Sequence, residues 1–214
     1  MLRTSSQKLK DFLTFPLRAF TLFHEDRWGL SSLASERFDY VASAVTGRAL
    51  DIGCGYGNRF VTDYLGGNGI GIDVFPYAGL TPEQIIEDLT HLPFPDASFD
   101  SVTFIANLNH APEPQRDPEL AESFRVLRAG GNIIVTMGLP IIEIIIHQVV
   151  WLYDRFLKTN VDMDSERGME EGESYFLTDA DIRARLTRAG FKRIVRKPFW
   201  TQWGMNGMYI GWKE

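Results

Sequence analysis

The sequence is poor in cysteine and has no long apolar run. Its 214 residues hold one cysteine, Cys54, so no intramolecular disulfide can form, which is typical of a reducing compartment. No stretch reaches the roughly 18 uninterrupted apolar residues of a membrane-spanning helix. The N-terminal residues mix Lys, Asp and Arg and lack the cleavage site of a signal peptide. We therefore expect a cytoplasmic protein.

Concentrated positive charge and metal-ligand patterns are also missing. The net charge is -6 and the basic residues form no single run, which argues against a nucleic-acid partner held through phosphates. No H-x-x-x-H, C-x-x-C or clustered carboxylate pattern is present, so we expect no metal site. Cys54 has no evident base nearby, and we interpret it as a small space-filling residue. The length and the 44% hydrophobic content fit one α/β domain with a sizeable core.

The most informative stretch is Ala49 to Arg59, with the sequence ALDIGCGYGNR. An apolar run, an acid and three glycines before a helical pattern predict a buried parallel strand that turns sharply into a helix. The glycines are Gly53, Gly55 and Gly57. Because glycine lacks a Cβ and tolerates positive φ, a ligand can approach the backbone of such a turn closely.

Two kinds of ligand fit a glycine-rich turn at this place. A dinucleotide fingerprint has its third glycine three residues after the second, whereas Gly57 comes two residues after the second and Asn58 takes the fingerprint position. Asp51 would face a pyrophosphate at short range, and like charges that close are destabilising. A cationic ligand such as S-adenosylmethionine, which carries an ammonium and a sulfonium, suits the acid better.

A second apolar run ends in another acid. Gly69 to Val74 predicts a buried strand, and Asp73 lies 20 residues after Gly53. In doubly wound folds an acid at the end of the second strand binds ribose hydroxyls. Only 11 residues separate Asp73 from Ile85, so we expect the second crossover helix to be lost or reduced to a turn, followed by a third strand over Ile85 to Leu89.

These motifs, in order, resemble the class I S-adenosylmethionine-dependent methyltransferases. The resemblance rests on DIGCGYG, on Asp88 followed by LPFPDASFD, and on NHAPEP followed by RVLRAGG. It covers roughly residues 48 to 137 with specific motifs and is closest to the small-molecule branch that includes quinone-biosynthesis methyltransferases (methyltransferase type 11). An N-P-P-Y type motif of amino-methylating enzymes is absent.

The resemblance implies an α/β, doubly wound, Rossmann-like sheet of seven mostly parallel strands in the order 3-2-1-4-5-7-6. We expect the remaining strands over Ser101–Ala106, Asn132–Met137, Phe191–Arg196 and Met205–Trp212, and helices over Ser35–Val45, Asn58–Leu65, Pro118–Leu127 and Thr178–Ala189.

The resemblance also implies the cofactor and the residues that hold it. The cofactor is S-adenosylmethionine, with S-adenosylhomocysteine as the product. Its amino-acid end would contact Asp51 and the glycines, its ribose Asp73, and its adenine Asp88. Val74 and Leu89, the residues directly after Asp73 and Asp88, would also contact the cofactor. Asn107, which follows the fourth strand, would contact it as well.

The acceptor is less clearly encoded. His110 is the best-placed candidate for a general base, although the same residue is also interpreted as a group that positions the loop or the cofactor. The aromatic residues of the outer segments favour a small hydrophobic or aromatic acceptor. The candidate acceptor-binding residues are His24, Trp28, Asn109, Trp200 and Trp203.

We expect residues 1–34 to form a helical cap on a methyltransferase domain of residues 35–214, with a cap or lid insertion at about 138–174. Pro16 predicts that the N-terminal segment is two short helices or a bent one. The sequence leaves open whether this segment and residues 141–157 cover the cleft, contact a membrane peripherally or join two subunits, so the protein is a monomer or a homodimer.

Three functions are compatible with these features. The first is methyl transfer to a small molecule. The second is a non-catalytic S-adenosylmethionine-binding protein that regulates or partners another protein. The third is an NAD(P)-dependent reductase with a Rossmann fold.

Overall fold

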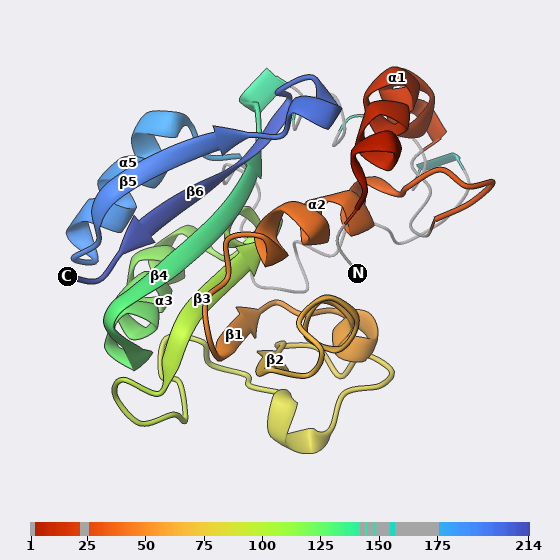
Figure 1. Ribbon diagram of the computed structural model, residues 1–214. Coiled ribbons are helices and arrows are strands. Elements are labelled where there is room, and N and C mark those ends of the chain that lie inside the picture. Colours follow the sequence, from red (N-terminus) through yellow and green to blue (C-terminus); the bar gives the residue numbers. More distant parts are fainter. Residues whose placement is uncertain (1–2, 22–25, 142–143, 145–147, 149–154, 157–175) are drawn as a thin grey trace.

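Helices pack on both faces of one central sheet in the computed structural model, which describes residues 3–21, 26–141, 144, 148, 155–156 and 176–214 (Figure 1). The strands are β1 (Ala49–Ile52), β2 (Gly69–Ile72), β3 (Phe99–Ile105), β4 (Leu127–Gly138), β5 (Lys192–Pro198) and β6 (Asn206–Trp212). The α-helices are α1 (Ser5–Thr21), α2 (Leu33–Ala42), α3 (Glu113–Val126) and α5 (Asp179–Arg188). Short helical turns are η1 (Tyr56–Asn58), η2 (Phe60–Tyr64), η3 (Pro82–Gln84), η4 (Leu108–His110) and η5 (Trp200–Gln202).

The sheet has the predicted doubly wound arrangement. Its strand order is β2-β1-β3-β4-β6-β5. β1 is parallel to both β2 and β3, β3 is parallel to β4, and β6 runs antiparallel to β4 and β5. This places the carboxyl ends of β1, β2 and β3 along one edge of the sheet, where open α/β folds bind ligands.

The prediction of a third strand over Ile85 to Leu89 was wrong. The described sheet has six strands instead of the predicted seven. A single parallel bridge between Asp73 and Ile85 is all that remains of that pairing. The segment before it holds only the three-residue turn η3, because 11 residues are too few for a crossover helix. The edge of the sheet beside β2 is therefore made by loop.

Several predicted helix boundaries also differ. The segment Asn58 to Leu65 forms the five-residue π-helical turn η2 rather than a full crossover helix. The third helix begins at Glu113, five residues before the predicted start, with Pro114 in its first turn. A proline fits there because the first-turn N–H groups have no helical partner. The helix then ends at Val126, one residue before the predicted end, and β4 begins at Leu127.

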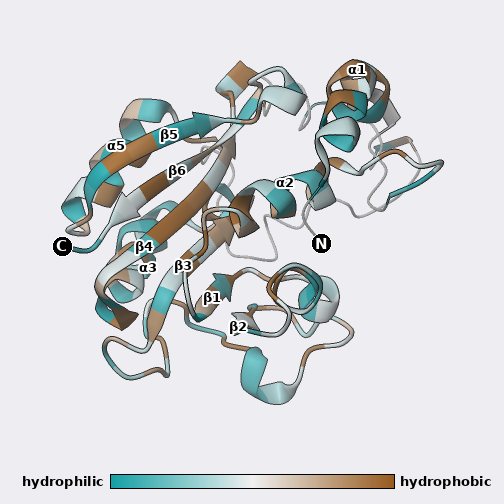
Figure 2. Ribbon diagram, in the orientation of Figure 1, coloured by the Kyte–Doolittle hydropathy of each residue, from teal (hydrophilic) through white to brown (hydrophobic). Residues whose placement is uncertain are grey.

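Apolar residues fill both faces of the sheet, as the brown stretches along the strands in Figure 2 illustrate. On one face Leu50, Val102 and Ile133 pack in a cluster with residues of α3 and α5, including Leu120 and Ile182. On the other face the core joins Ile134 and Met208 to Val41 of α2 and Phe60 of η2. The sheet edge that carries the site is thus held rigidly from both sides.

The N-terminal helix α1 continues through Pro16 as one helix. Because proline lacks an N–H, the carbonyl of Phe12, four residues earlier, has no helical donor from that position. The indole Nε1 of Trp203 donates to this carbonyl at 3.0 Å. Trp203, which directly follows η5, thus supplies the hydrogen bond that Pro16 cannot donate to the Phe12 carbonyl.

Most of the predicted insertion at about 138–174 lies outside the described residues, so the expected division into cap, domain and insertion stays a prediction. No described helix is long and apolar enough to cross a membrane.

Candidate cofactor site

The turn after β1 needs glycine for different reasons at different positions. At Gly53 (φ +77°) an added Cβ would lie 2.2 Å from Cγ of Asn107, so any side chain would collide with the loop after β3. Gly55 has φ 63° and ψ -160°, a region that residues with a Cβ essentially never adopt. A Cβ at Gly55 would meet no atom within 4 Å, so the space beside this residue is open. The turn therefore presents bare backbone to a ligand.

The carboxylate of Asp73 ties this turn to the end of β2. It is 1% exposed; its Oδ2 accepts a hydrogen bond from the Gly55 N–H at 2.9 Å, and its Oδ1 accepts one from the Phe75 N–H at 3.1 Å. The N–H groups of Gly53 and Cys54 donate to the carbonyl of Ile72 at 2.8 and 3.0 Å. Since each carboxylate oxygen accepts more than one hydrogen bond, Asp73 keeps acceptor capacity for ligand hydroxyls.

Asp51 lies deeper than the sequence suggested. It is 1% exposed, and Thr103 Oγ1 on the neighbouring strand donates to its Oδ1 at 2.6 Å. Burial raises the pKa of Asp51 to about 7; the Thr103 bond opposes this rise and the charge of Asp73 adds to it. Asp51 is not among the described residues that line the pocket.

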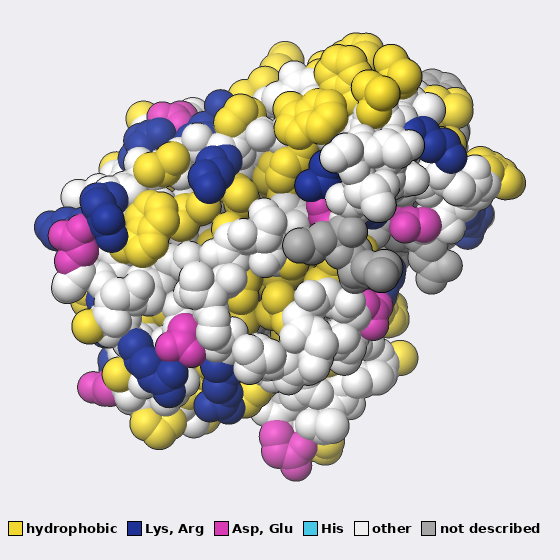
Figure 3. Space-filling model, in the orientation of Figure 1, with side chains coloured by type: hydrophobic (Ala, Val, Ile, Leu, Met, Phe, Trp, Pro, Cys, Tyr) yellow, Lys and Arg dark blue, Asp and Glu magenta, His cyan; other side chains and the backbone are white. Residues whose placement is uncertain are grey.

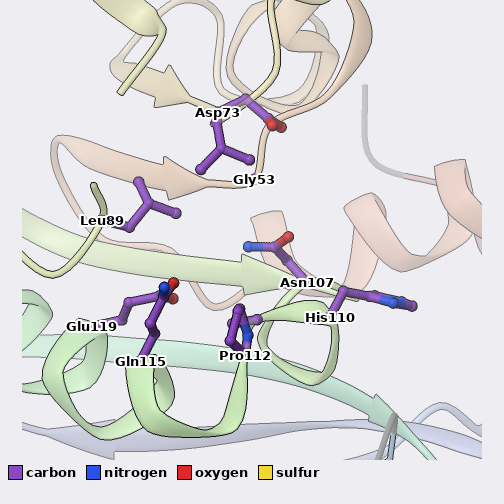
Figure 4. A pocket seen from close by; sticks show the side chains of 10 residues that line it. Gly53, Asp73, Leu89, Asn107, His110, Pro112, Gln115 and Glu119 are labelled. Atoms are coloured by element: carbon purple, nitrogen blue, oxygen red, sulfur yellow. The ribbon is translucent and has the colours of Figure 1, made fainter. Parts of the chain in front are cut away.

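The structure gathers six of the predicted residues around one pocket, shown in Figure 4. They are Gly53, Asp73, Val74, Leu89, Asn107 and His110. The pocket is also lined by four residues that sequence reasoning missed: Ala111, Pro112, Gln115 and Glu119. Gln115 and Glu119 lie four residues apart on α3 and share one helix face, but the helix was predicted to begin only at Pro118. Placing Pro114 in the first turn would have revealed that face.

Arg116 of α3 holds the loop that carries His110 through hydrogen bonds from its guanidinium to two backbone carbonyls. This guanidinium is 1% exposed; its Nε donates to the carbonyl of Ala111 at 2.8 Å and an Nη to that of Asn109 at 3.1 Å. The side-chain amide of Asn109 hydrogen-bonds Nε2 of His110 at 3.1 Å. Asn109 therefore orients the histidine, and it is buried rather than part of the pocket lining.

Several other predicted site residues lie apart from this pocket. The Asp88 carboxylate accepts hydrogen bonds from the N–H and hydroxyl of Thr90 at 2.8 and 2.6 Å, and its side chain is 61% exposed. Trp28 is 81% exposed, and Trp200 and Trp203 contact Phe12 of α1. His24 lies outside the described residues. A role for these side chains toward the acceptor, or for Asp88 toward adenine, stays a prediction.

A doubly wound sheet with a glycine turn after its first described strand and a buried acid after its second defines a Rossmann-like domain for a nucleoside-containing ligand. Residues 50–135 match the methyltransferase domain family. The chain is also similar to the ubiquinone/menaquinone biosynthesis C-methyltransferase of Brucella anthropi, with 29% identity over 57% of this chain and 47% of the relative. The chain thus spans about half the length of the curated relatives it matches.

Two solved structures share the fold. An S-adenosylmethionine-dependent methyltransferase of Methanosarcina mazei is 21% identical, with coverage of 81% of this chain and 96% of the other and a TM-score of 0.54. The 1,6-didemethyltoxoflavin-N1-methyltransferase of Burkholderia thailandensis, solved with bound 1,6-didemethyltoxoflavin and S-adenosylhomocysteine, is 13% identical, with coverage of 96% of this chain and 80% of the other and a TM-score of 0.51. Residues 50–135 thus match a methyltransferase domain, and the chain shares the fold of solved S-adenosylmethionine-dependent methyltransferases.

Proposed function

We propose that this protein transfers the methyl group of S-adenosylmethionine to a small hydrophobic or aromatic acceptor. The proposal rests on one observation: the glycine turn is hydrogen-bonded to Asp73, which lines a pocket. Both lie in the chain segment that matches the methyltransferase domain family. The sulfonium is a strong methyl donor, so the protein's main task is to align the acceptor with the methyl group and to exclude water. The C–S bond breaks as the bond to the acceptor forms, and sulfur keeps the electron pair in S-adenosylhomocysteine.

We place the cofactor along the carboxyl ends of β1 and β2. The bare backbone at Gly53, Gly55 and Gly57 would receive the methionine part, and Asp73 would accept hydrogen bonds from the ribose hydroxyls. The apolar side chains of Val74 and Leu89 line the pocket and would flank the adenine. The buried negative charge of Asp51 favours a cation above the turn.

The hydrogen bonds of the turn argue against a dinucleotide. In a dinucleotide-binding turn the backbone N–H groups point at the pyrophosphate. Here the N–H groups of Gly53, Cys54 and Gly55 already donate to Ile72 and to the Asp73 carboxylate. A pyrophosphate would have to displace these bonds and then sit against two buried carboxylates, Asp51 and Asp73.

The acceptor side of the site is proposed at the loop of Asn107 and His110. Ala111 and Pro112 continue the lining with apolar surface, which supports a hydrophobic acceptor. The Brucella anthropi relative is named for a C-methylation in quinone biosynthesis, and a quinone-like ring is therefore the first acceptor to test. When the acceptor carries an acidic proton, His110 would take it through Nε2 after its bond to Asn109 opens. The single cysteine supports a cytoplasmic setting for this reaction.

Calorimetry tests the cofactor assignment. We expect S-adenosylmethionine and S-adenosylhomocysteine to bind the full chain and NAD(H) not to bind. Binding of NAD(H) without the other two would identify a reductase and overturn the proposal. A methyl-transfer screen with quinones, lipids, amines and small acids then separates the enzyme from a non-catalytic binder, which would bind the cofactor tightly and turn over none of them.

A further inference from the structure

The helix α1 turns three leucines outward and two charged side chains inward. Leu9, Leu13 and Leu17 follow one another every four residues, so they lie on one side of the helix, and they are 56%, 67% and 55% exposed. On the inward side Asp11 is 0% and Arg18 is 1% exposed. A helix on a globular domain normally buries its apolar stripe and leaves its charges in water. This inverted arrangement marks the outward side as a contact surface.

Specific bonds hold the inward side in place. An Nη of Arg18 donates to Oε2 of Glu36 at 2.9 Å, and the hydroxyl of Ser31 donates to Oδ2 of Asp11 at 3.0 Å. Both acids are buried, so rotation of α1 about its axis would leave charges without these partners at high cost. The leucines are therefore held on the outside.

Aromatic side chains extend the leucine surface onto η5. The ring of Phe12 lies 5.8 Å from that of Trp200 and 6.2 Å from that of Trp203. These three rings are 37%, 47% and 49% exposed. We call the combined area the α1 surface, and it consists of Leu9, Phe12, Leu13, Leu17, Trp200 and Trp203. Hydrophobic side chains gather over α1 on the face shown in Figure 3.

Positive charge lies beside the α1 surface although the whole chain has a net charge of -6. The edge strand β5 leads directly into η5, and its Lys197 lies three residues before Trp200, is exposed and forms no ion pair with the described residues. Lys and Arg side chains lie along β5 next to the hydrophobic area in Figure 3. Apolar surface bordered by tryptophan and lysine is typical of a helix that lies in a membrane interface.

We propose that the α1 surface docks on a membrane that contains anionic lipid, with the leucines in the acyl boundary and Lys197 at the headgroups. A second copy of this chain is a poorer partner, because a two-fold interface would bring the two lysine-bearing edges toward each other. The proposal is independent of the proposed methyl transfer, since it concerns a surface that can be tested without cofactor or acceptor.

Vesicle flotation of the full chain tests this docking. We expect the protein to float with vesicles of phosphatidylcholine and phosphatidylglycerol, and less with phosphatidylcholine alone. The triple change Leu9→Ser, Leu13→Ser and Leu17→Ser should lower the partition coefficient at least about tenfold, because it removes the inserted apolar area. The change Lys197→Gln should lower it about fivefold on the anionic vesicles only.

Two controls match these variants. The triple Leu→Met variant keeps apolar side chains at the same positions and should float like the wild type, while Arg128→Gln removes an exposed charge at the start of β4 and should change nothing. Circular dichroism verifies that each variant folds. No flotation of the wild type, equal flotation of the Leu→Ser variant, or a dimer in sedimentation velocity that this variant abolishes would each overturn the proposal.

Discussion

At the scale of single residues, two buried carboxylates define the cofactor site. Asp73 is held by two backbone N–H groups and faces the pocket, whereas Asp51 is held by one hydroxyl and lies beneath the turn. The two environments give the acids different tasks. In the proposed site Asp73 would offer hydrogen-bond acceptors to the cofactor, and Asp51 would supply a negative charge whose presence depends on pH.

Replacement of Asp73 by Ala should weaken binding of S-adenosylmethionine by about 1 to 3 kcal/mol, because ligand hydroxyls lose their acceptor and the turn loses its bond at Gly55. Calorimetry measures this change. Asp73→Asn is the matched variant, since its amide keeps one acceptor oxygen and should lose less affinity. Unchanged affinity in Asp73→Ala would refute the ribose assignment.

The raised pKa of Asp51 predicts a dependence of stability on pH. In the unfolded chain an Asp ionises near pH 4 and here the folded pKa is about 7, so the folded state binds the proton more tightly. Stability from this group is therefore full below about pH 4 and falls as pH rises toward about 7, by about 4 kcal/mol at most.

Asp51→Asn removes this ionisation and keeps an oxygen for the Thr103 hydroxyl. We expect the variant to equal the wild type near pH 4 and to be more stable at pH 8, as measured by urea unfolding at both values. A difference between the two proteins that does not change with pH would contradict the raised pKa. The difference between variant and wild type cancels the contributions of the titrating groups that do not interact with Asp51.

At the scale of elements, the joint between α1 and η5 depends on a proline. Pro16 leaves the carbonyl of Phe12 without its usual helical donor, and Trp203 supplies the replacement. Trp203→Phe should cost about 1 kcal/mol of stability for the lost hydrogen bond. In a Pro16→Ala background the helical N–H returns to this carbonyl, so the same change should cost less. A double-mutant cycle in urea measures the coupling, and additive effects would show that the two residues act independently.

Elements that depend on local pattern were predicted well. The apolar run and glycines around Gly53 predicted β1 and its turn, and Thr178 with Asp181 forms the cap at the expected start of α5. The prediction of the third strand was wrong because a strand needs a neighbouring strand in register. The short loop after Asp73 permits only one bridge, between Asp73 and Ile85. Gln115 was missed because α3 begins at Glu113, whereas the predicted helix begins only at Pro118.

At the scale of the whole molecule, buried charges join the N-terminal helix to the rest of the chain. Oε2 of Glu36 accepts hydrogen bonds from Arg18 of α1 at 2.9 Å and from Gln202 of η5 at 2.8 Å. Segments from both ends of the sequence thus meet at one carboxylate on α2. We expect α1 and the sheet to unfold as one cooperative unit.

Removal of one partner should be more harmful than removal of both. Arg18→Met leaves the buried Glu36 without its counter-charge and should cost about 3 to 5 kcal/mol, whereas Arg18→Met with Glu36→Leu should recover part of this loss. Urea unfolding followed by far-UV circular dichroism and by tryptophan fluorescence measures both stability and cooperativity. Equal stability of the single and the double variant, or separate transitions for the two probes, would contradict this joint.

The sequence by itself determined the class of site in this protein. Glycine spacing, apolar runs and the acids at their ends act over a few residues, so the local pattern alone places Gly53 and Asp73 at neighbouring strand ends. Only the tertiary structure decided what those residues touch. Asp51 meets Thr103 across 52 residues, and Trp203 meets Phe12 across 191. Such contacts arise when strands pair and helices dock, and that packing set the burial of Asp51, the outward leucines of α1 and the α3 face of the pocket.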